Sequence, residues 1–237
     1  MAVKAAAGRP RKERVENAAM RRRQLIEATI DSIVEHGLSA TTLATVSDGA
    51  GLSQGVAVFY FKNKQTLLAE TLKYHYEEYT EVWKSAVAAA PDDPVEKILA
   101  IVGADLDERI CNPRHLALWN SFWGEAKARP VFAEICDTYD AEHTDVLIAL
   151  CHEAEDLIAD PSWNAESLAE ALVTMTDGMW IRMHVTPDAM SNADGRRMVC
   201  RFLATMLPSR HAQIMAHMPG GKDAAKPGAK TKKAGQP

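Results

Sequence analysis

The sequence predicts an all-α protein with a small N-terminal three-helix domain and a larger all-helical domain. Apolar residues recur at three- and four-residue spacing through most of the chain, which is the period of amphipathic helices. No stretch shows the strict alternation that is typical of a half-buried strand. X–Pro pairs separate the helical segments, as expected where helices end.

The composition is that of an ordinary globular chain, with 47% hydrophobic and 25% charged residues among 237. No apolar run is long enough to cross a bilayer, and the basic start lacks the apolar region of a signal peptide. We therefore expect a cytoplasmic protein without membrane contact. The four cysteines form no CxxC pair and have no histidine cluster nearby, so we expect free thiols and no metal site.

The net charge of −5 conceals an uneven distribution along the chain. Residues 1–23 carry eight Lys and Arg against two Glu, and residues 219–237 carry five Lys against one Asp. A basic arm beside an acidic body indicates a local site for a polyanion. We expect residues 1–18 and 209–237 to be disordered, and GRPRK at 8–12 is typical of arms that enter the DNA minor groove.

The first helix is predicted over residues 18–36. Leu25, Ile26 and Ile30 recur on one side of it, and Gly37 is a typical C-terminal stop. Three arginines at 21–23 stand at its start, where positive charge opposes the helix dipole. A nearby phosphate would offset that cost, which makes Arg22 a candidate DNA contact.

Residues 41–64 read as two short helices joined by a tight turn. Thr41 or Thr42 can cap the first of them, and Gly51 ends it. Ser53 can cap the second, whose first turn contains the small or polar side chains of Gln54, Gly55 and Val56. A short helix with such an N-terminus fits the DNA major groove.

Glycine at position 55 is a poor helix former, and close approach of the backbone to DNA would explain it. A long helix follows over about 65–88, with Leu67, Leu72, Tyr76 and Trp83 along one stripe. Further helices are expected at about 94–110, 114–127, 130–158, 164–185 and 191–207.

The order of these signals resembles the TetR family of transcriptional regulators. It begins with the arginine-rich helix and the Thr-Thr start, continues with AGLS and SQGVAVFYFKNKQTLL, and ends with an all-helical remainder. The resemblance implies a DNA-binding domain at 19–79 and a ligand-binding and dimerisation domain at 80–208. Within the family, the chain is most similar to choline-responsive repressors of glycine betaine synthesis genes. The segments that carry this closer similarity are RRRQLIEATI, YFKNK, KILAIVGADLDE, LWNSFWGEA and TDGMWIRM.

The resemblance implies a homodimer that binds operator DNA and is released by a small-molecule effector. The family's dimer contact corresponds to residues of about 134–158 and 164–185. By matching position, the first turn after Ser53 faces bases, whereas Tyr60 and Lys64 hold phosphates. Val58 departs from the family's frequent tyrosine. The predicted DNA contacts are Arg22, Thr42, Ser53, Gln54, Gly55, Val56, Tyr60 and Lys64.

Phe59 and Phe61 in the same segment are expected to be core residues of the small domain, because aromatic side chains bury large apolar areas.

A choline-like cation has no N–H groups, so aromatic faces and a carboxylate would have to recognise it. Trp119 and Trp123 are four residues apart on one helical face, and Asp177 and Trp180 are three apart in an apolar run. The predicted ligand contacts are Trp119, Phe122, Trp123, Asp177 and Trp180. The alternative is that both tryptophans belong to the core. Asp105, Asp107 and Glu108 are expected mostly on a solvated face, with the alternative that one of them lines the ligand pocket.

Three other functions compete with this one. A TetR-type regulator could answer a polyamine, an aldehyde or an acyl-CoA. An enzyme is disfavoured, because Ser/His/Asp and metal patterns are absent and His115, His143 and His152 are isolated from one another; no cofactor is expected. Non-specific architectural DNA binding would suit the basic termini.

Overall fold

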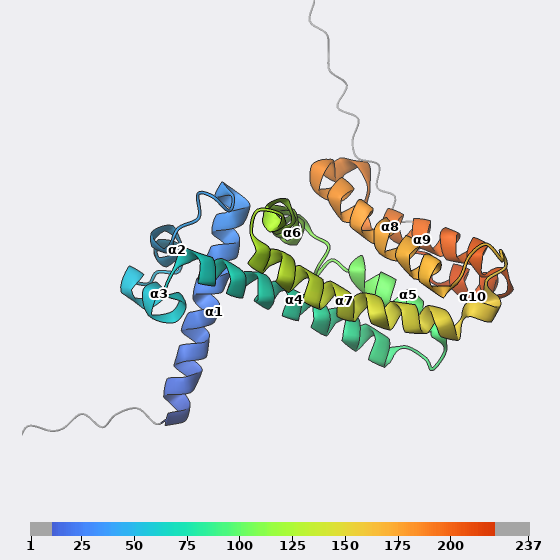
Figure 1. The fold of residues 1–237 in the computed structure, drawn as a ribbon, viewed down its shortest axis with the longest axis horizontal. Helices are drawn as coiled ribbons and strands as arrows, with labels where there is room; N and C mark the ends of the chain where they lie inside the picture. The colour runs from blue at the N-terminus through green and yellow to red at the C-terminus, as the bar shows by residue number, and fades with distance from the viewer. Residues whose placement is uncertain (1–10, 221–237) are drawn as a thin grey trace, which may run out of the picture. The chain divides into compact units, whose positions relative to one another are not determined.

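The computed structural model describes residues 11–220, and in this range every regular element is helical (Figure 1). The predicted all-α class is therefore confirmed. The GRPRK motif, apart from its last two residues, and the lysine tail after Gly220 lie outside the described residues. The α-helices are α1 (Arg11–His36), α2 (Leu43–Gly49), α3 (Gln54–Phe61), α4 (Lys64–Ala89), α5 (Pro94–Asp105), α6 (Pro113–Ala126), α7 (Pro130–Glu153), α8 (Ala165–Val185), α9 (Asn192–Met206) and α10 (His211–Ala216).

The chain divides into two compact units. The first comprises the residues up to Thr80 together with Ala117–Asp140. The second comprises Glu81–Leu116 together with the residues from Ala141 onward. Helices α4, α6 and α7 each contribute residues to both units.

In the first unit, α2 packs against both α1 and α3 around one apolar core. Leu25, Ile26 and Ile30 of α1 are at most 1% exposed, as their spacing predicts. Helix α1 begins at Arg11, so the prediction of a disordered arm through residue 18 is wrong for its last eight residues. Residues 11–18 combine charged residues with alanine and contain no proline or glycine, which favours continuation of the helix.

Two glycines set the turns around α2. Gly37 has φ +82° and Gly51 has φ +63°, and residues that carry a Cβ rarely adopt such positive φ angles. Thr42 caps α2 with a capping box, in which its side chain accepts from the Thr45 N–H and the Thr45 side chain accepts from the Thr42 N–H. These local signals fix the length of α2 and the position at which α3 starts.

In the second unit, α5 packs against α8, α9 and α10, and α8 packs against α9. Helix α10 lies within residues that the sequence predicted to be disordered, so that prediction is wrong for 211–216. Ile214 is fully buried, and Gln213 donates hydrogen bonds to Asp93 and Glu96 at the start of α5. These contacts, made far from α10 in sequence, hold the helix in place.

Among the helices of residues 11–220, none combines the length and the apolar character needed to cross a membrane.

Candidate functional sites

Helix α3 is anchored on one side and presents the other to solvent. Ala57 and Phe61 are at most 1% exposed, whereas Gln54 and Gly55 are exposed. Phe59 is 79% exposed, so the prediction that it belongs to the core is wrong, although the prediction for Phe61 is confirmed. An eight-residue helix does not have enough buried positions for both rings, because residues two apart point in nearly opposite directions.

The exposed face of α3 begins with Gly55, which has open space around it. A Cβ added there would meet only the Ser53 hydroxyl, at 3.9 Å. Internal packing therefore does not require a glycine, and its small size leaves the backbone of the first turn accessible to a ligand. Val56 is half-buried on the same turn, and Val58 is 44% exposed.

The two predicted capping residues behave differently. Thr42 makes the capping bonds of α2, whereas Ser53 occupies the N-cap position of α3 without a side-chain capping bond. Lys64 begins α4 and donates from Nζ to the Ser39 carbonyl at 2.8 Å, which joins α4 to the loop before α2. Burial, followed by the charge of Arg129, lowers the pKa of Lys64. Tyr60 is half-buried, and its ring meets that of Phe59 edge to face at 5.2 Å.

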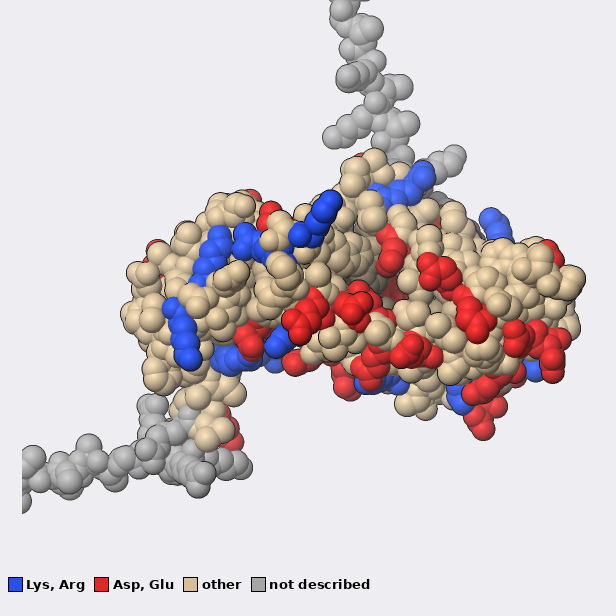
Figure 2. Space-filling model, viewed as in Figure 1, with Lys and Arg blue, Asp and Glu red and all other residues tan. Residues whose placement is uncertain are grey.

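Arg22 is used inside the first unit. Its guanidinium forms an ion pair with Glu70 of α4 and lies 5.7 Å from the centroid of the Phe61 ring. Its neighbours Arg21 and Arg23 are exposed. On the face shown in Figure 2, Lys and Arg gather over the first unit, whereas Asp and Glu gather over the second.

An aromatic cluster in the first unit contains two of the predicted ligand contacts. Trp119 is 1% exposed and stacks on Trp123 with ring centroids 5.9 Å apart. Tyr76 meets Trp119 edge to face at 4.5 Å and donates from its hydroxyl to Asp140 at 3.1 Å. The remaining rings of the cluster are those of His75, Tyr79 and Tyr139.

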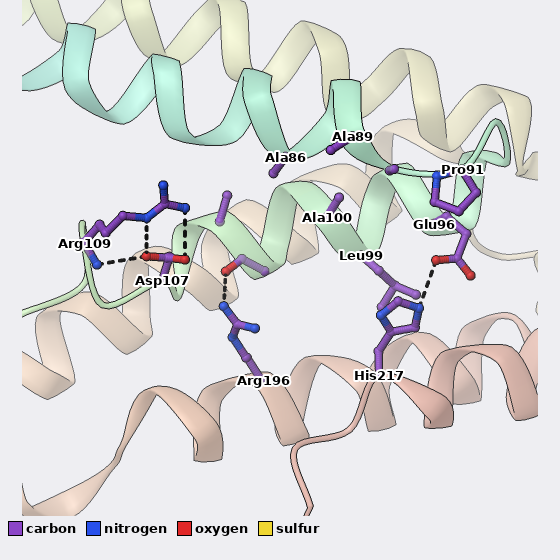
Figure 3. Close-up of a pocket in the computed structure, with 13 residues that line it drawn as sticks. Ala86, Ala89, Pro91, Glu96, Leu99, Ala100, Asp107, Arg109, Arg196 and His217 are labelled. Atoms are coloured by element: carbon purple, nitrogen blue, oxygen red, sulfur yellow. Dashed lines mark hydrogen bonds and ion pairs between the residues drawn. The ribbon is translucent and has the colours of Figure 1, made fainter.

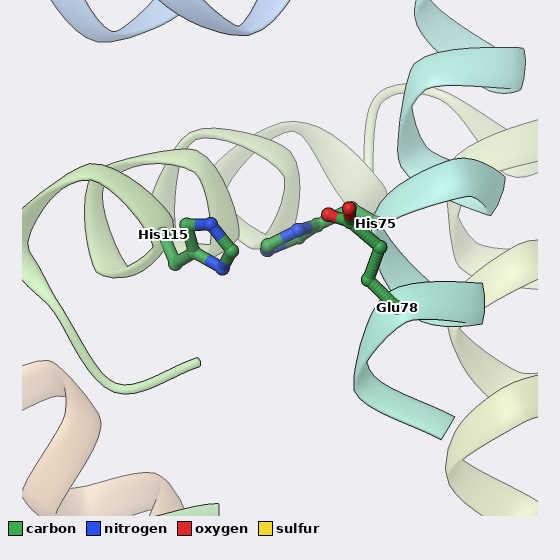
Figure 4. Close-up of side chains that lie close together, drawn as sticks. All are labelled: His75, Glu78 and His115. Carbon is green, nitrogen blue, oxygen red and sulfur yellow. The ribbon is translucent and has the colours of Figure 1, made fainter. Parts of the chain in front are cut away.

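Phe122, the third predicted contact on α6, is fully buried against Phe132, with ring centroids 5.0 Å apart. Its environment is that of a core residue. Figure 4 shows two polar neighbours in the first unit, His75 and Glu78, which are three residues apart on α4; His115, also drawn, belongs to the second unit.

The second unit contains a buried carboxylate that lies beside a histidine, and two tryptophans contact this pair of residues. Asp105 is 2% exposed, and its Oδ1 lies 3.2 Å from Nε2 of His143 on α7. The ring of Trp83 meets that of His143 edge to face at 5.5 Å. Trp180 of α8 donates from Nε1 to the Asp105 carbonyl at 2.8 Å. The prediction that Asp105 lies on a solvated face is therefore wrong.

Asp177 stands beside this group but on the exposed side of α8. The spacing along the apolar run 172–183 predicts a buried Asp177, but Leu172 and Thr176 take the buried positions and Asp177 is exposed. The protein around it still replaces part of its water. This burial, together with the charge of Asp105, raises the pKa of Asp177 to about 6, while His143 acts in the opposite direction.

The sequence did contain a signal for Asp105. Ile98, Ile101 and Val102 are buried on α5, and position 105 follows them at three- and four-residue spacing, so it falls on the same face. No comparable signal pairs Asp105 with His143, since 38 positions of chain separate them and the contact depends on packing of α5 with α7.

Two family models match the chain. Residues 25–71 match the model described as bacterial regulatory proteins of the tetR family, and residues 94–208 match the BetI-type transcriptional repressor C-terminal model. The transcriptional regulator BetI of Stenotrophomonas maltophilia is 30% identical over 78% of this chain and 91% of that protein. BetI of Burkholderia thailandensis is 32% identical over 69% of this chain and 81% of its own length.

Solved structures agree on the fold. A putative transcriptional regulator from Pseudomonas aeruginosa superposes with a TM-score of 0.71 at 22% identity, over 83% of this chain and 94% of that one. One from Saccharomonospora viridis, solved in complex with choline, gives a TM-score of 0.68 at 16% identity, over 78% and 96%.

The fold and the exposed short helix define a helix-turn-helix transcription regulator. The chain belongs to the TetR family, and its C-terminal part is that of a BetI-type repressor. This family regulates transcription and is not a family of enzymes.

Proposed function

We propose that the protein is a homodimeric repressor that acts in the cytoplasm and leaves its operator when choline or a related quaternary ammonium binds. The observation that carries the effector assignment is the buried Asp105 beside His143, with the Trp83 ring against this histidine and the Trp180 indole on the Asp105 backbone carbonyl. A quaternary cation is recognised by aromatic faces and by negative charge, because it has no hydrogen to donate. The BetI names of the relatives and the choline complex of the Saccharomonospora regulator favour the same class.

Two groups of residues are candidates to contact the cation. Asp177 and Trp180 accompany Asp105 in the second unit, and Trp119 and Trp123 belong to the aromatic cluster of the first. In the first group the carboxylates supply charge, and the indoles supply both packing and a quadrupole. Phe122 supports this proposal least, because its ring is covered by Phe132.

For DNA binding we propose that α3 enters the major groove. Gln54 can read a base edge, and Gly55 lets the backbone of the first turn approach. Val56 and the exposed Val58 offer apolar contact to a thymine methyl group. Phosphate contacts are proposed for Thr42, Ser53, Tyr60 and Lys64. For Arg22, a DNA contact competes with its ion pair to Glu70.

The dimer contact is proposed on α8 together with α9. Ile181 and Val185 of α8 are 46% and 68% exposed, and Met198 of α9 is 45% exposed. A second copy would cover these apolar side chains, which otherwise stand in water. The family resemblance implies a contact through residues 134–158 and 164–185, and α8 belongs both to this contact and to the one proposed here.

The test uses fluorescence anisotropy of the labelled upstream DNA, titrated with the full-length dimer. Choline should lower the apparent affinity, and the neutral analogue with carbon in place of the quaternary nitrogen should have no effect. Spermidine, butyraldehyde and an acyl-CoA, none of which carries a quaternary ammonium, test the alternative effectors. Release by one of these, with no response to choline, would reject the quaternary ammonium assignment but keep the repressor.

Variants then locate the cation. Asp105→Asn keeps the side-chain shape but removes the charge, and Trp123→Ala removes one aromatic face from the other candidate group. Asp145→Asn is the matched control, because Asp145 lies on α7 near His143 but is exposed. Choline release should be weakened by Asp105→Asn and unchanged in the control. If Trp123→Ala alone abolishes the response, the cation binds in the first unit.

A further inference from the structure

A pocket of about 340 Å³ in the second unit is not used by the proposed function (Figure 3). It lies among the last turns of α4, helices α5 and α9, and the end of α10. Small and apolar side chains form much of its wall: Ala86, Ala89, Ala90, Leu99 and Ala100. Its volume is at the lower end of the range for small-molecule sites, which is about 300–1,000 Å³.

Arg196 of α9 is the polar group with the largest unused binding capacity in this pocket. Its guanidinium donates from Nη2 to the Gly103 carbonyl at 2.7 Å, and the side chain is only partly exposed. A guanidinium carries five N–H donors in a planar fork. Within residues 11–220, no carboxylate lies within ion-pairing distance of Arg196, so most of the fork remains available.

The neighbouring carboxylate, Asp107, is hydrogen-bonded to another arginine, and the charge of Arg196 acts on it only as the last of the causes that lower its pKa. Asp107 accepts from Arg109 through both oxygens, from Nε at 2.9 Å and from Nη2 at 3.2 Å. Hydrogen bonding from Arg109 lowers the pKa of Asp107. One arginine and one aspartate cancel, and the second arginine leaves this end of the pocket positive.

At the opposite end of the pocket, the polar side chains are already paired with one another. Glu96 accepts from Gln213 at 2.9 Å, and its other oxygen lies 2.9 Å from Nε2 of His217. Glu96 and Gly103 are seven residues apart on α5, so about 10 Å of helix axis separates the two ends. The space between them is bordered by alanines, which suit a short apolar body.

We infer that this pocket is a second ligand site, and that it takes a short-chain organic carboxylate. The carboxylate would pair with the fork of Arg196, since planar bidentate pairing is the strongest contact that a guanidinium offers. The hydrocarbon body would lie against Ala86, Ala89 and Ala100. This anion site differs from the cation site in the sign of its ligand and in its residues.

The proposed dimer contact leaves this site open. Arg196 and Met198 are two residues apart on α9, which places them about 200° apart around the helix. A partner that covers Met198 therefore faces away from Arg196. The inference does not rest on the identity of the effector, because no residue of the pocket belongs to the proposed cation contacts.

The probe is butyrate, added at millimolar concentrations to the full-length protein and followed by saturation-transfer NMR and calorimetry. Propanol and propylammonium share its propyl body and should not bind. Arg196→Gln should weaken butyrate binding about ten-fold or more, because it removes a charge-assisted pair. Ala89→Leu should weaken it as well, since the larger side chain fills the pocket from an exposed helix position where folding tolerates it.

Two matched variants separate the site from general effects. Arg197→Gln removes the adjacent arginine, which pairs with Asp194 outside the pocket. Ala88→Leu adds the same bulk at an exposed position of α4 that does not line the pocket. Both should bind butyrate as the wild type does, and saturating choline should not compete. Absence of butyrate binding to the folded wild type would overturn the inference. So would binding that survives Ala89→Leu unchanged.

Discussion

The two units of this protein use charged residues in opposite ways. In the first unit, the exposed short helix α3 carries no charged side chain, and Lys64 stands at the surface just after it. In the second unit, Asp105 is buried with His143, and the only partner of Arg196 in residues 11–220 is a backbone carbonyl in a pocket. A charge lost from the first unit should therefore reduce DNA affinity, whereas one lost from the second should reduce stability or ligand binding.

The largest expected effect breaks the buried pair of the second unit. Asp105→Ala leaves His143 without its carboxylate in a site that excludes water. Removing one partner of a buried pair costs about 3–5 kcal/mol. Denaturant unfolding of the full-length chain, followed by circular dichroism, measures the loss. The exposed Asp145→Ala should change stability by no more than about 0.5 kcal/mol, and an equal loss in both variants would contradict the comparison.

The next largest effect is a loss of DNA affinity caused by variants of the first unit that leave the stability of the fold unchanged. Gln54→Ala should weaken operator binding about ten-fold, because a bidentate base contact contributes about 1–3 kcal/mol. Lys64→Ala should weaken specific and random DNA alike and reduce the salt slope of binding by about one unit. Anisotropy titrations over a series of salt concentrations measure both. Lys73→Ala, an exposed lysine further along α4, is the control. A salt slope that Lys64→Ala leaves unchanged would remove its phosphate role.

The two units also differ in how much of their structure the sequence predicts. The turns of the first unit depend on neighbouring residues, such as Thr42 with Thr45 and the positive φ of Gly51, so the pattern of 41–64 predicts them. The buried groups of the second unit depend on partners far away in the chain. Trp180 bonds to Asp105 across 75 positions and Arg196 to Gly103 across 93. Helical periodicity predicts which face is buried, but not which residues of two faces meet.

Errors in the prediction follow the same rule. The aromatic ring of Phe59 predicts a core residue, yet the short α3 buries only Ala57 and Phe61 fully. The sequence of α10 has no strong periodic pattern and therefore does not predict this helix, which is stabilised by the burial of Ile214 and by the hydrogen bond from Gln213 to Asp93. The family model and the BetI relatives confirm the fold and the regulator class, whereas the individual contacts to DNA and effector stay predictions.

A smaller effect sharpens the comparison within the first unit. Thr42→Ala removes the capping box of α2 and should cost about 1 kcal/mol of local stability. Ser53→Ala should lower local stability by only about 0.3 kcal/mol, because the Ser53 side chain makes no capping bond to α3. Native-state hydrogen exchange of the α2 and α3 amides measures the two losses separately. If Ser53→Ala weakens DNA binding without a change in exchange, its hydroxyl contacts DNA instead of the helix.

The smallest effect is a pH dependence that belongs to the second unit. The pKa of Asp177 is raised to about 6, first by burial and then by the charge of Asp105, so the folded protein binds this proton more tightly than the unfolded chain. Its contribution to stability is complete below the ordinary pKa of 3.8 and is lost as the pH rises through about 6. Asp177→Asn should flatten this part of the stability curve. The exposed Asp188→Asn should leave it unchanged.

Choline gives the same titration a functional consequence. A cation favours the ionised carboxylate, so choline affinity should rise as the pH increases through about 6. In Asp177→Asn, choline affinity should not change with pH in this range. Operator binding without choline should not show this step, because Asp177 belongs to the second unit and the DNA-reading residues belong to the first. Calorimetry at several pH values measures the first curve, and anisotropy measures the second. A step in both curves would mean that the titration of Asp177 also changes DNA binding. The claim that charges of the second unit affect only stability and ligand binding would then be wrong.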